Sequence, residues 1–283
     1  MIKLNNLHLR FPGGLAKCLT LSYDDGVEQD MRLCALMKKH GIAGTFNIST
    51  GNYSPEGKIF EKGRVHRPMT QRQCLETYKD QPLFEVATHA LHHAWLPNIP
   101  LSEAVHEIIE DRRNIENQYG TICRGHAYPY GAYSDDIANI LKSCGIVYAR
   151  TTVSTHKFRL PENWLMLNPT CHHKDASLME LADNFLSDTP KRSPLFFYLW
   201  GHTFEFESDN NWNVIERFFE KIGGNPEIWY ATNIEVYDYV QAFNSLIFSA
   251  DGHNVFNPTS ADVWISLDSK SIYKIPKGET IKL

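Results

Sequence analysis

Short apolar segments alternate with amphipathic helical patterns along most of the chain, and this alternation most constrains the fold. Residues 17–23 form an apolar run typical of a buried strand, and residues 28–40 place apolar side chains on one helix face. Further strands are predicted at 44–49, 84–88, 123–128, 146–152 and 195–200, helices at 102–119, 134–143, 176–186 and 211–222, and a last strand–helix unit at 227–243. Because parallel strands joined by helices are buried on both faces, they appear as uninterrupted apolar runs. The pattern predicts an α/β fold with a parallel sheet, open or closed into a barrel.

The tail of the chain has a different pattern. Its short β-type segments at 246–248, 263–267 and 272–275 are separated by turn-forming residues, among them Ser269-Lys270. We expect a small antiparallel β addition, residues 245–283, packed on a main domain of residues 1–244.

Composition and charge exclude several classes of function. The formal charge is −5, and the sequence has no cluster of basic residues that would bind nucleic acid. The apolar runs are far shorter than the ~20 residues that cross a bilayer, and residues 1–6 lack the apolar core of a secretory signal. The six cysteines are scattered without a CxxC pair. We therefore expect a cytoplasmic protein with no nucleic-acid or membrane partner; the oligomeric state stays open.

Polar residues follow three of the predicted strands. Asp24 and Asp25 follow the first strand, His89 and His93 follow a middle one, and His202 follows a late one. Functional side chains collect at the C-terminal ends of parallel strands, and two adjacent carboxylates there need a cation or a proton between them. One helical turn would place both imidazoles of the histidine pair on one face. The alternatives are an ordinary Asp-Gly turn and a pair of interior histidines.

Asp25, His89 and His93 together fit a catalytic metal site. Two imidazole nitrogens and one carboxylate leave positions open for water and substrate. We expect one divalent ion, with zinc first, although cobalt, nickel or iron(II) accept the same ligands. Such an ion would lower the pKa of a bound water towards ~7 and polarise a carbonyl oxygen.

These motifs resemble the polysaccharide deacetylase family, also called the NodB-homology or carbohydrate esterase family 4 group. Ser22-Tyr23-Asp24-Asp25-Gly26 is similar to the family's first motif, Thr-Phe-Asp-Asp-Gly, and His89-Ala90-Leu91-His92-His93 to its second, His-(Ser/Thr)-x-x-His. The resemblance covers roughly residues 15–243. It implies a distorted (β/α) barrel of about seven strands, with Asp24 as the catalytic base and Asp25, His89 and His93 as the metal ligands.

The third motif of the family, Arg-x-Pro-x-Gly, is similar to Ala127-Tyr128-Pro129-Tyr130-Gly131. The arginine that holds the base in the family is Ala127 here, and whether Arg124 compensates is open. Without that arginine we expect Asp24 to sit differently or to have a raised pKa. By resemblance, the backbone N–H of Tyr130 is the oxyanion donor; a rigid turn is the alternative.

The late motif, Leu-x-His, is similar to Trp200-Gly201-His202, and the resemblance makes His202 the catalytic acid. A core histidine is the alternative. We expect four residues to contact substrate: Tyr128, Pro129, Trp164 and Trp200. Residues 168–173, which include two histidines, either line the groove or lie behind it. Glu205 and Glu207 contact either substrate or solvent.

The implied reaction is hydrolysis of an acetyl amide on a glucosamine-type sugar, so the expected partner is acetylated carbohydrate. Asp24 removes a proton from metal-bound water, the metal and Tyr130 hold the oxyanion, and His202 protonates the departing amine. The alternatives are an O-acetyl sugar esterase, another amide hydrolase, or a non-catalytic sugar-binding protein. The missing arginine favours the binding protein and Asp24 favours the enzyme; His126 is the other candidate for the catalytic residue.

Overall fold

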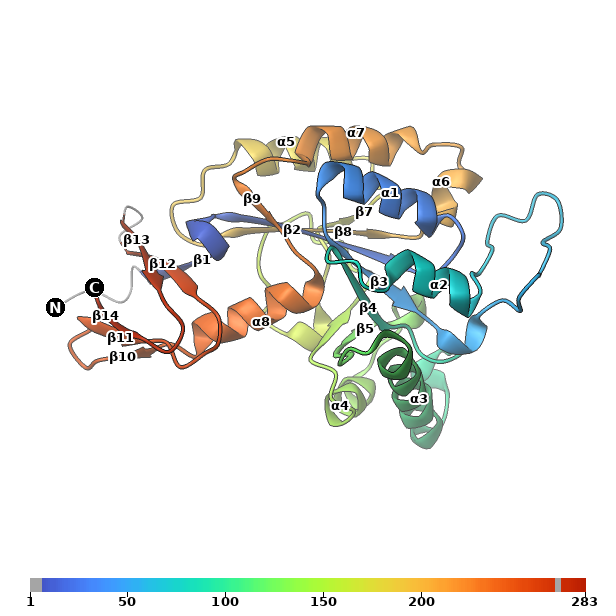
Figure 1. Cartoon of the computed structure of the whole chain (residues 1–283), viewed down its shortest axis with the longest axis horizontal. Coiled ribbons are helices and arrows are strands. Elements are labelled where there is room, and N and C mark those ends of the chain that lie inside the picture. The colour runs from blue at the N-terminus through green and yellow to red at the C-terminus, as the bar shows by residue number, and fades with distance from the viewer. Residues whose placement is uncertain (1–6, 268–270) are drawn as a thin grey trace.

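The computed structural model describes residues 7–267 and 271–283 (Figure 1). The N-terminal residues 1–6 and the turn expected at Ser269-Lys270 lie outside the described residues.

A curled parallel sheet forms the centre of the molecule. Its strands in spatial order are β6 (Tyr148–Arg150), β5 (Gly125–Ala127), β4 (Phe84–Thr88), β3 (Gly44–Ile48), β2 (Lys17–Asp24), β8 (Leu195–Gly201) and β7 (Cys171–His172), and β9 (Ile228–Tyr230) also pairs with β2. Every residue of β2 is buried, as expected for a central parallel strand. Because all these strands run in one direction, their C-terminal ends, and the residues after them, meet at one edge.

The segment between β6 and β7 brings the sheet close to closure. The Leu167 N–H donates to the Ala149 carbonyl on β6 (2.9 Å), and the Thr170 N–H donates to the Tyr198 carbonyl on β8 (2.8 Å). One segment therefore contacts both sides of the sheet, and the expected distorted barrel of about seven strands is confirmed.

Helices cover the sheet, with α1, α5 and α7 on one side and α3 and α4 on the other in Figure 1. They are α1 (Asp30–His40), α2 (Gln71–Tyr78), α3 (Leu101–Tyr119), α4 (Asp135–Ser143), α5 (Leu178–Ser187), α6 (Phe204–Ser208), α7 (Asn213–Ile222) and α8 (Asn233–Asn244). Short 3-10 turns are η2 (Pro12–Gly14), η3 (Thr50–Asn52), η4 (Leu96–Asn98), η5 (Pro129–Gly131) and η6 (Trp164–Met166). Capping boxes at Thr70 and Thr232 begin α2 and α8, which satisfies backbone N–H groups that have no partner inside the helix.

The tail forms the expected antiparallel addition, at the far end of α8 (Figure 1). Its strands are β10 (Ile247–Phe248), β11 (Asn254–Phe256), β12 (Val263–Leu267), β13 (Ser271–Ile275) and β14 (Thr280–Lys282). The N-terminal strand β1 (Leu7–Arg10) pairs with β12, a long-range pairing that the sequence pattern did not predict. The division of the chain at residue 244 stays a prediction.

None of the helices in the described part of the chain has the length and apolar character needed to span a bilayer.

Candidate metal centre and active site

Three side chains named as metal ligands converge at the C-terminal edge of the sheet. Asp25 follows β2, and His89 and His93 follow β4. The Oδ1 atom of Asp25 lies 3.8 Å from Nε2 of His89 and 3.8 Å from Nε2 of His93. One donor atom from each residue therefore faces a common point.

A tight turn, not the expected helical turn, brings the two histidines together. Ala90 and His93 have left-handed backbone conformations, with φ of 60° and 56°, which cost energy for residues other than glycine. The buried Asp111 on α3 stabilises the turn, since its carboxylate accepts the His89 N–H (3.2 Å) and the Thr50 N–H (2.8 Å). The prediction of a helical turn is wrong, although the spacing of four residues still pairs the rings.

The protonation of these residues suits a divalent cation. Nδ1 of His89 lies 2.7 Å from the Ala127 carbonyl, so it carries the proton and leaves the Nε2 lone pair free. Burial and the neighbouring His89 lower the pKa of His93 to about 4, which keeps its ring neutral. Burial alone would raise the pKa of Asp25, but a hydrogen bond from His66 (3.2 Å to Oδ2) and the nearby histidines lower it. The donor set fits the metal, whose binding stays a prediction.

Asp24 is buried beside this group, and both of its oxygens have partners. Asn47 donates to Oδ1 (2.8 Å), and the Arg150 guanidinium donates to Oδ2. Burial alone would raise the pKa of Asp24, but Arg150 and the histidines His89 and His202 lower it below its usual value. The expectation of a raised pKa is therefore wrong.

Arg150 makes the contact with Asp24 that the resemblance assigned to an arginine at position 127. The two residues are direct neighbours across the parallel pair β5 and β6, so a side chain at either position reaches the same place. Arg150 is 1% exposed, and its guanidinium lies 4.3 Å from the centre of the Trp200 ring. Arg124 instead pairs with Asp238 at the surface. Asp24 therefore has a buried arginine partner although position 127 is alanine, and the choice between enzyme and binding protein stays a prediction. The sequence signal for this contact was an arginine inside a predicted apolar strand, which the comparison of motifs did not use.

His202 lies on the other side of Asp24. Its Nε2 is 3.8 Å from Oδ2 of Asp24, and its Nδ1 is 3.3 Å from Oε2 of Glu205. Burial lowers the pKa of His202, but the bond to Glu205 and the charge of Asp24 outweigh burial and raise the pKa. His202 therefore holds a proton more readily than a free histidine. His126, the other candidate, is fully buried and pairs with Thr88.

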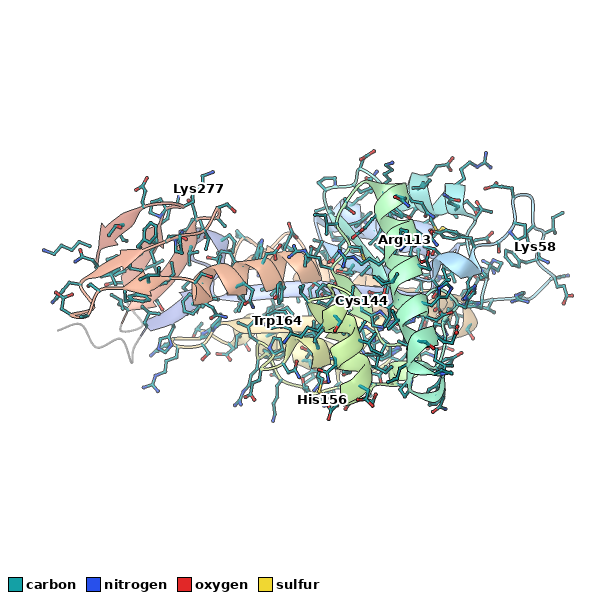
Figure 2. The ribbon with its side chains drawn as sticks, turned by 90° about the horizontal axis from the view of Figure 1, so that it is seen from below. Lys58, Arg113, Cys144, His156, Trp164 and Lys277 are labelled. Carbon is teal, nitrogen blue, oxygen red and sulfur yellow. The ribbon has the colours of Figure 1, made fainter. Side chains whose placement is uncertain are left out.

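The residues expected to contact substrate lie mostly inside the protein. Tyr128 is 1% exposed and its hydroxyl donates to the Leu165 carbonyl, and Pro129 is also buried. Trp200 lies beneath Arg150, and Trp164, labelled in Figure 2, packs edge-on against Tyr237 of α8. These placements point to roles in packing.

An exposed aromatic pair lies at the metal centre instead. The rings of Trp95 and Tyr130 stack with centroids 5.2 Å apart, and Tyr130 also contacts the His93 ring edge-on at 4.5 Å. Trp95 is 49% and Tyr130 61% exposed. Sequence reasoning missed Trp95, although it follows His93 by two residues. The pair offers a flat apolar surface next to the proposed ligands.

Tyr130, the expected oxyanion donor, has a left-handed backbone conformation. It has φ 58° within the short turn η5, and the second N–H of such a turn has no acceptor inside it. The Tyr130 N–H therefore has no acceptor inside the turn, and its role as oxyanion donor stays a prediction.

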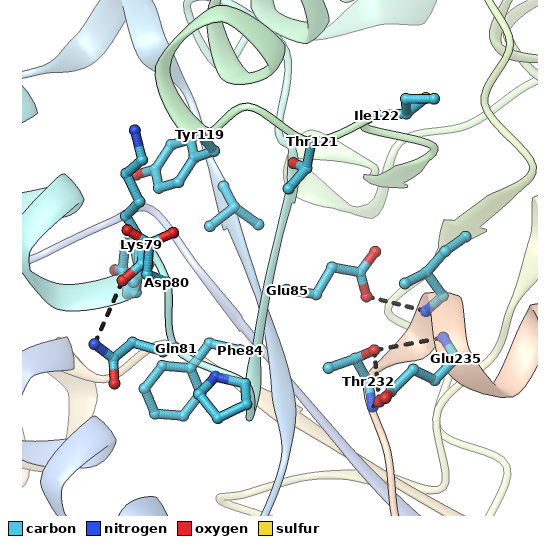
Figure 3. A pocket seen from close by; sticks show the side chains of 14 residues that line it. Lys79, Asp80, Gln81, Phe84, Glu85, Tyr119, Thr121, Ile122, Thr232 and Glu235 are labelled. Atoms are coloured by element: carbon cyan, nitrogen blue, oxygen red, sulfur yellow. Dashed lines mark hydrogen bonds between the residues drawn. The ribbon is translucent and has the colours of Figure 1, made fainter.

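A separate cavity of about 440 Å³ lies at the opposite edge of the sheet (Figure 3). Glu85 borders it from the N-terminal half of β4. Burial raises the pKa of Glu85 to about 7, but its oxygens already accept bonds from Thr45, Tyr148 and the Ile234 N–H. These contacts tie α8 to the sheet, so the metal centre remains the candidate site.

Comparison with known proteins confirms the expected resemblance. The family model "Polysaccharide deacetylase" matches residues 13–149, just under half of the chain. No curated protein sequence matches the chain.

Solved structures share the fold. A structure of a putative polysaccharide deacetylase from Mycobacterium smegmatis is 13% identical, with TM-score 0.56, and the match covers 83% of this chain and 94% of that one. The Xyl-CE4 domain of a multidomain xylanase from the hindgut metagenome of Trinervitermes trinervoides is 16% identical, with TM-score 0.51, over 80% and 92% of the two chains. The Streptococcus pyogenes deacetylase PplD, in complex with acetate, is 20% identical, with TM-score 0.43, over 52% of this chain and 61% of that one, which is less than two thirds of its length. The first two structures show that this chain has the carbohydrate esterase 4 fold, and the family model matches residues 13–149.

Proposed function

We propose that this chain, whose residues 13–149 match the polysaccharide deacetylases, is a metal-dependent hydrolase that removes acetyl groups from N-acetylated, glucosamine-type carbohydrate. The observation that carries the proposal is the division of roles between two adjacent carboxylates. Asp25 directs Oδ1 toward both His89 and His93. Oδ2 of Asp24 also lies 3.8 Å from Nε2 of His89, but hydrogen bonds from Asn47 and Arg150 occupy both oxygens of Asp24.

Asp25, His89 and His93 would hold the ion, with zinc expected from the two imidazoles and one carboxylate. When bound, a divalent ion makes water a strong nucleophile at neutral pH and polarises a carbonyl oxygen.

The protein's own residues supply the proton transfers. Asp24 is ionised, because Arg150 lowers its pKa, and therefore accepts the proton of the attacking water. His202 has a raised pKa, so it carries a proton to give to the departing sugar nitrogen. The Tyr130 N–H donates to the oxygen that gains charge as the acetyl carbon becomes tetrahedral.

The exposed aromatic pair supports carbohydrate as the proposed substrate class. Trp95 and Tyr130 present stacked rings beside the metal ligands, and a pyranose ring offers a flat C–H face that packs on such a surface. A sugar placed there would lie beside His93, one of the proposed ligands.

Acetate release from a panel of N- and O-acetylated sugars tests the proposal. We expect the zinc-reconstituted protein to release acetate from N-acetylglucosamine oligomers, and Asp24→Asn to lose about 100-fold or more of that rate while it keeps its metal. Asp238→Asn, which removes a surface carboxylate on α8, is the control and should be unchanged. If Asp24→Asn is as fast as the wild type, Asp24 is not the base and the proposal fails. Release from O-acetyl sugars alone would identify an esterase.

A further inference from the structure

A second group of histidine and carboxylate side chains lies on the far side of His202. His172 and His173 stand at the C-terminal end of β7, and Glu205 lies on α6. Oε2 of Glu205 is 3.1 Å from Nε2 of His172 and 3.2 Å from Nε2 of His173. One donor atom from each of the three residues lies within 4.8 Å of the others.

The two separations from Glu205 match those of ligands on one small cation. Zinc binds imidazole nitrogen and carboxylate oxygen at about 2.0–2.2 Å in a tetrahedron, which places two ligand atoms roughly 3.3 Å apart. Hydrogen bonds explain only part of the arrangement. The contact between His173 and Glu205 lacks hydrogen-bond geometry, and neither ring nitrogen of His173 has a hydrogen-bond partner in the described residues.

The fold holds His173 rigidly in this position. The residue is 1% exposed, and its ring packs against the rings of Tyr23 and Phe206, with centroids 5.7 and 4.1 Å away. The ring also occupies the space over Gly201, where a Cβ atom would come within 2.0 Å of Nδ1. A buried polar ring without a partner destabilises a fold, and a ligand that takes its lone pair removes that penalty.

The charge of Lys174 is directed to Oε1 of Glu205, and Oε2 faces the two imidazoles. Lys174 lies 3.3 Å from Oε1 of Glu205 and 2.8 Å from Asp209, so its charge is balanced and directed to the other oxygen. The Lys174 N–H donates to Nδ1 of His172 (3.1 Å), which places the ring proton on Nε2. Binding therefore requires this proton to move or leave, as metal binding to histidine does generally. Nδ1 of His202 also lies 3.3 Å from Oε2 of Glu205.

We propose that His172, His173 and Glu205 form a second binding site for a divalent cation of the zinc type, separate from Asp25, His89 and His93. Two imidazoles favour zinc, nickel or copper over magnesium or calcium. An ion there would compete with His202 for Oε2 of Glu205. The inference rests on its own contacts and not on the proposed function.

Metal stoichiometry tests this site directly. Each variant is saturated with zinc, dialysed and measured by mass spectrometry for zinc per chain, and far-UV circular dichroism confirms that it is folded. We expect two ions in the wild type, one in His89→Ala/His93→Ala, one in His172→Ala and none in the triple variant. His172 is the residue to change because it is partly exposed. Glu205→Gln, which keeps the side-chain shape, should weaken zinc binding in the His89→Ala/His93→Ala background at least tenfold.

His106→Ala is the matched control, because it removes an exposed imidazole on α3 that belongs to neither group, and it should keep two ions. A folded His89→Ala/His93→Ala protein without zinc overturns the second site. A His172→Ala protein that binds zinc as fully as the wild type overturns it as well. If instead His172→Ala holds none and His89→Ala/His93→Ala holds one, the second site stands and the metal centre of the proposed function fails.

Discussion

Replacing Arg150 with methionine should move the acidic limb of the pH–rate profile to higher pH. Methionine keeps an apolar stem against the Trp200 ring but removes the cation that pairs with Asp24. Burial is the largest influence on the pKa of Asp24 and acts to raise it; Arg150 is the first of the groups that reverse this effect.

The size of this change in pKa follows from the loss of a cation next to a buried carboxylate. An adjacent cation lowers the pKa of a carboxylate by about 1–3 units, or roughly 1.4–4 kcal/mol. In the wild type the depressed pKa of Asp24 contributes stability above the unfolded pKa of about 3.9, and this is lost as the pH falls through the folded pKa. In Arg150→Met the folded pKa rises above the unfolded one. The contribution of Asp24 to the free energy of unfolding then changes sign, and Asp24 destabilises the protein more as the pH rises. An unpaired buried charge costs about 3–5 kcal/mol.

The assay combines rate and stability. We expect the acidic limb of the pH profile of kcat/KM for acetate release to move to higher pH by about 1–3 pH units. We expect the loss in the free energy of unfolding, measured by urea titration, to be larger at pH 7 than at pH 4. Arg150→Lys keeps the charge and should shift the limb less. Arg124→Met removes the surface pair with Asp238 and should shift nothing. Adding Ala127→Arg to Arg150→Met should move the limb back, since positions 127 and 150 are neighbours. If Arg150→Met keeps the wild-type limb and stability, Arg150 does not hold the base.

The other predictions concern the remaining roles. Asp25→Asn should lose activity together with the ion expected at Asp25, His89 and His93, measured as zinc per chain and acetate released; retention of that ion would contradict the role of Asp25 as a ligand. His202→Ala should keep the metal and lose about 100-fold or more on amides but much less on activated aryl acetates, where the leaving group needs no proton; equal losses would argue against an acid. Trp95→Ala should raise KM for sugar oligomers by about tenfold, or 1.4 kcal/mol of stacking, with kcat little changed. Trp200→Phe, which keeps an aromatic ring at a buried position, should leave that KM unaltered.

Features set by the local sequence were predictable. The apolar runs placed β2 and β4 within one residue of their observed ends, and the polar residues after them converge because parallel strands share one edge. The spacing of four between His89 and His93 paired their rings even though the turn is not helical, since the pairing needs proximity and not a particular backbone form.

Features set by register between strands were not predictable. Arg150 reaches Asp24 only because β6 pairs with β5 in one register, and a change of one residue would direct it to the other face of the sheet. The pairing of β1 with β12 and the contact of His66 with Asp25 join segments far apart in the chain. Local periodicity carries no information about such partners.

The neighbouring positions 127 and 150 have a consequence for how related sequences should vary. One carboxylate can neutralise one buried guanidinium, so two arginines would leave a positive charge unmatched and two small residues would leave Asp24 unmatched. Selection should therefore act on the pair, and arginine at one position should exclude arginine at the other. The absence of arginine from the third motif is then not enough to make a relative inactive. The residue at the neighbouring position on the next strand decides whether Asp24 keeps a positively charged partner.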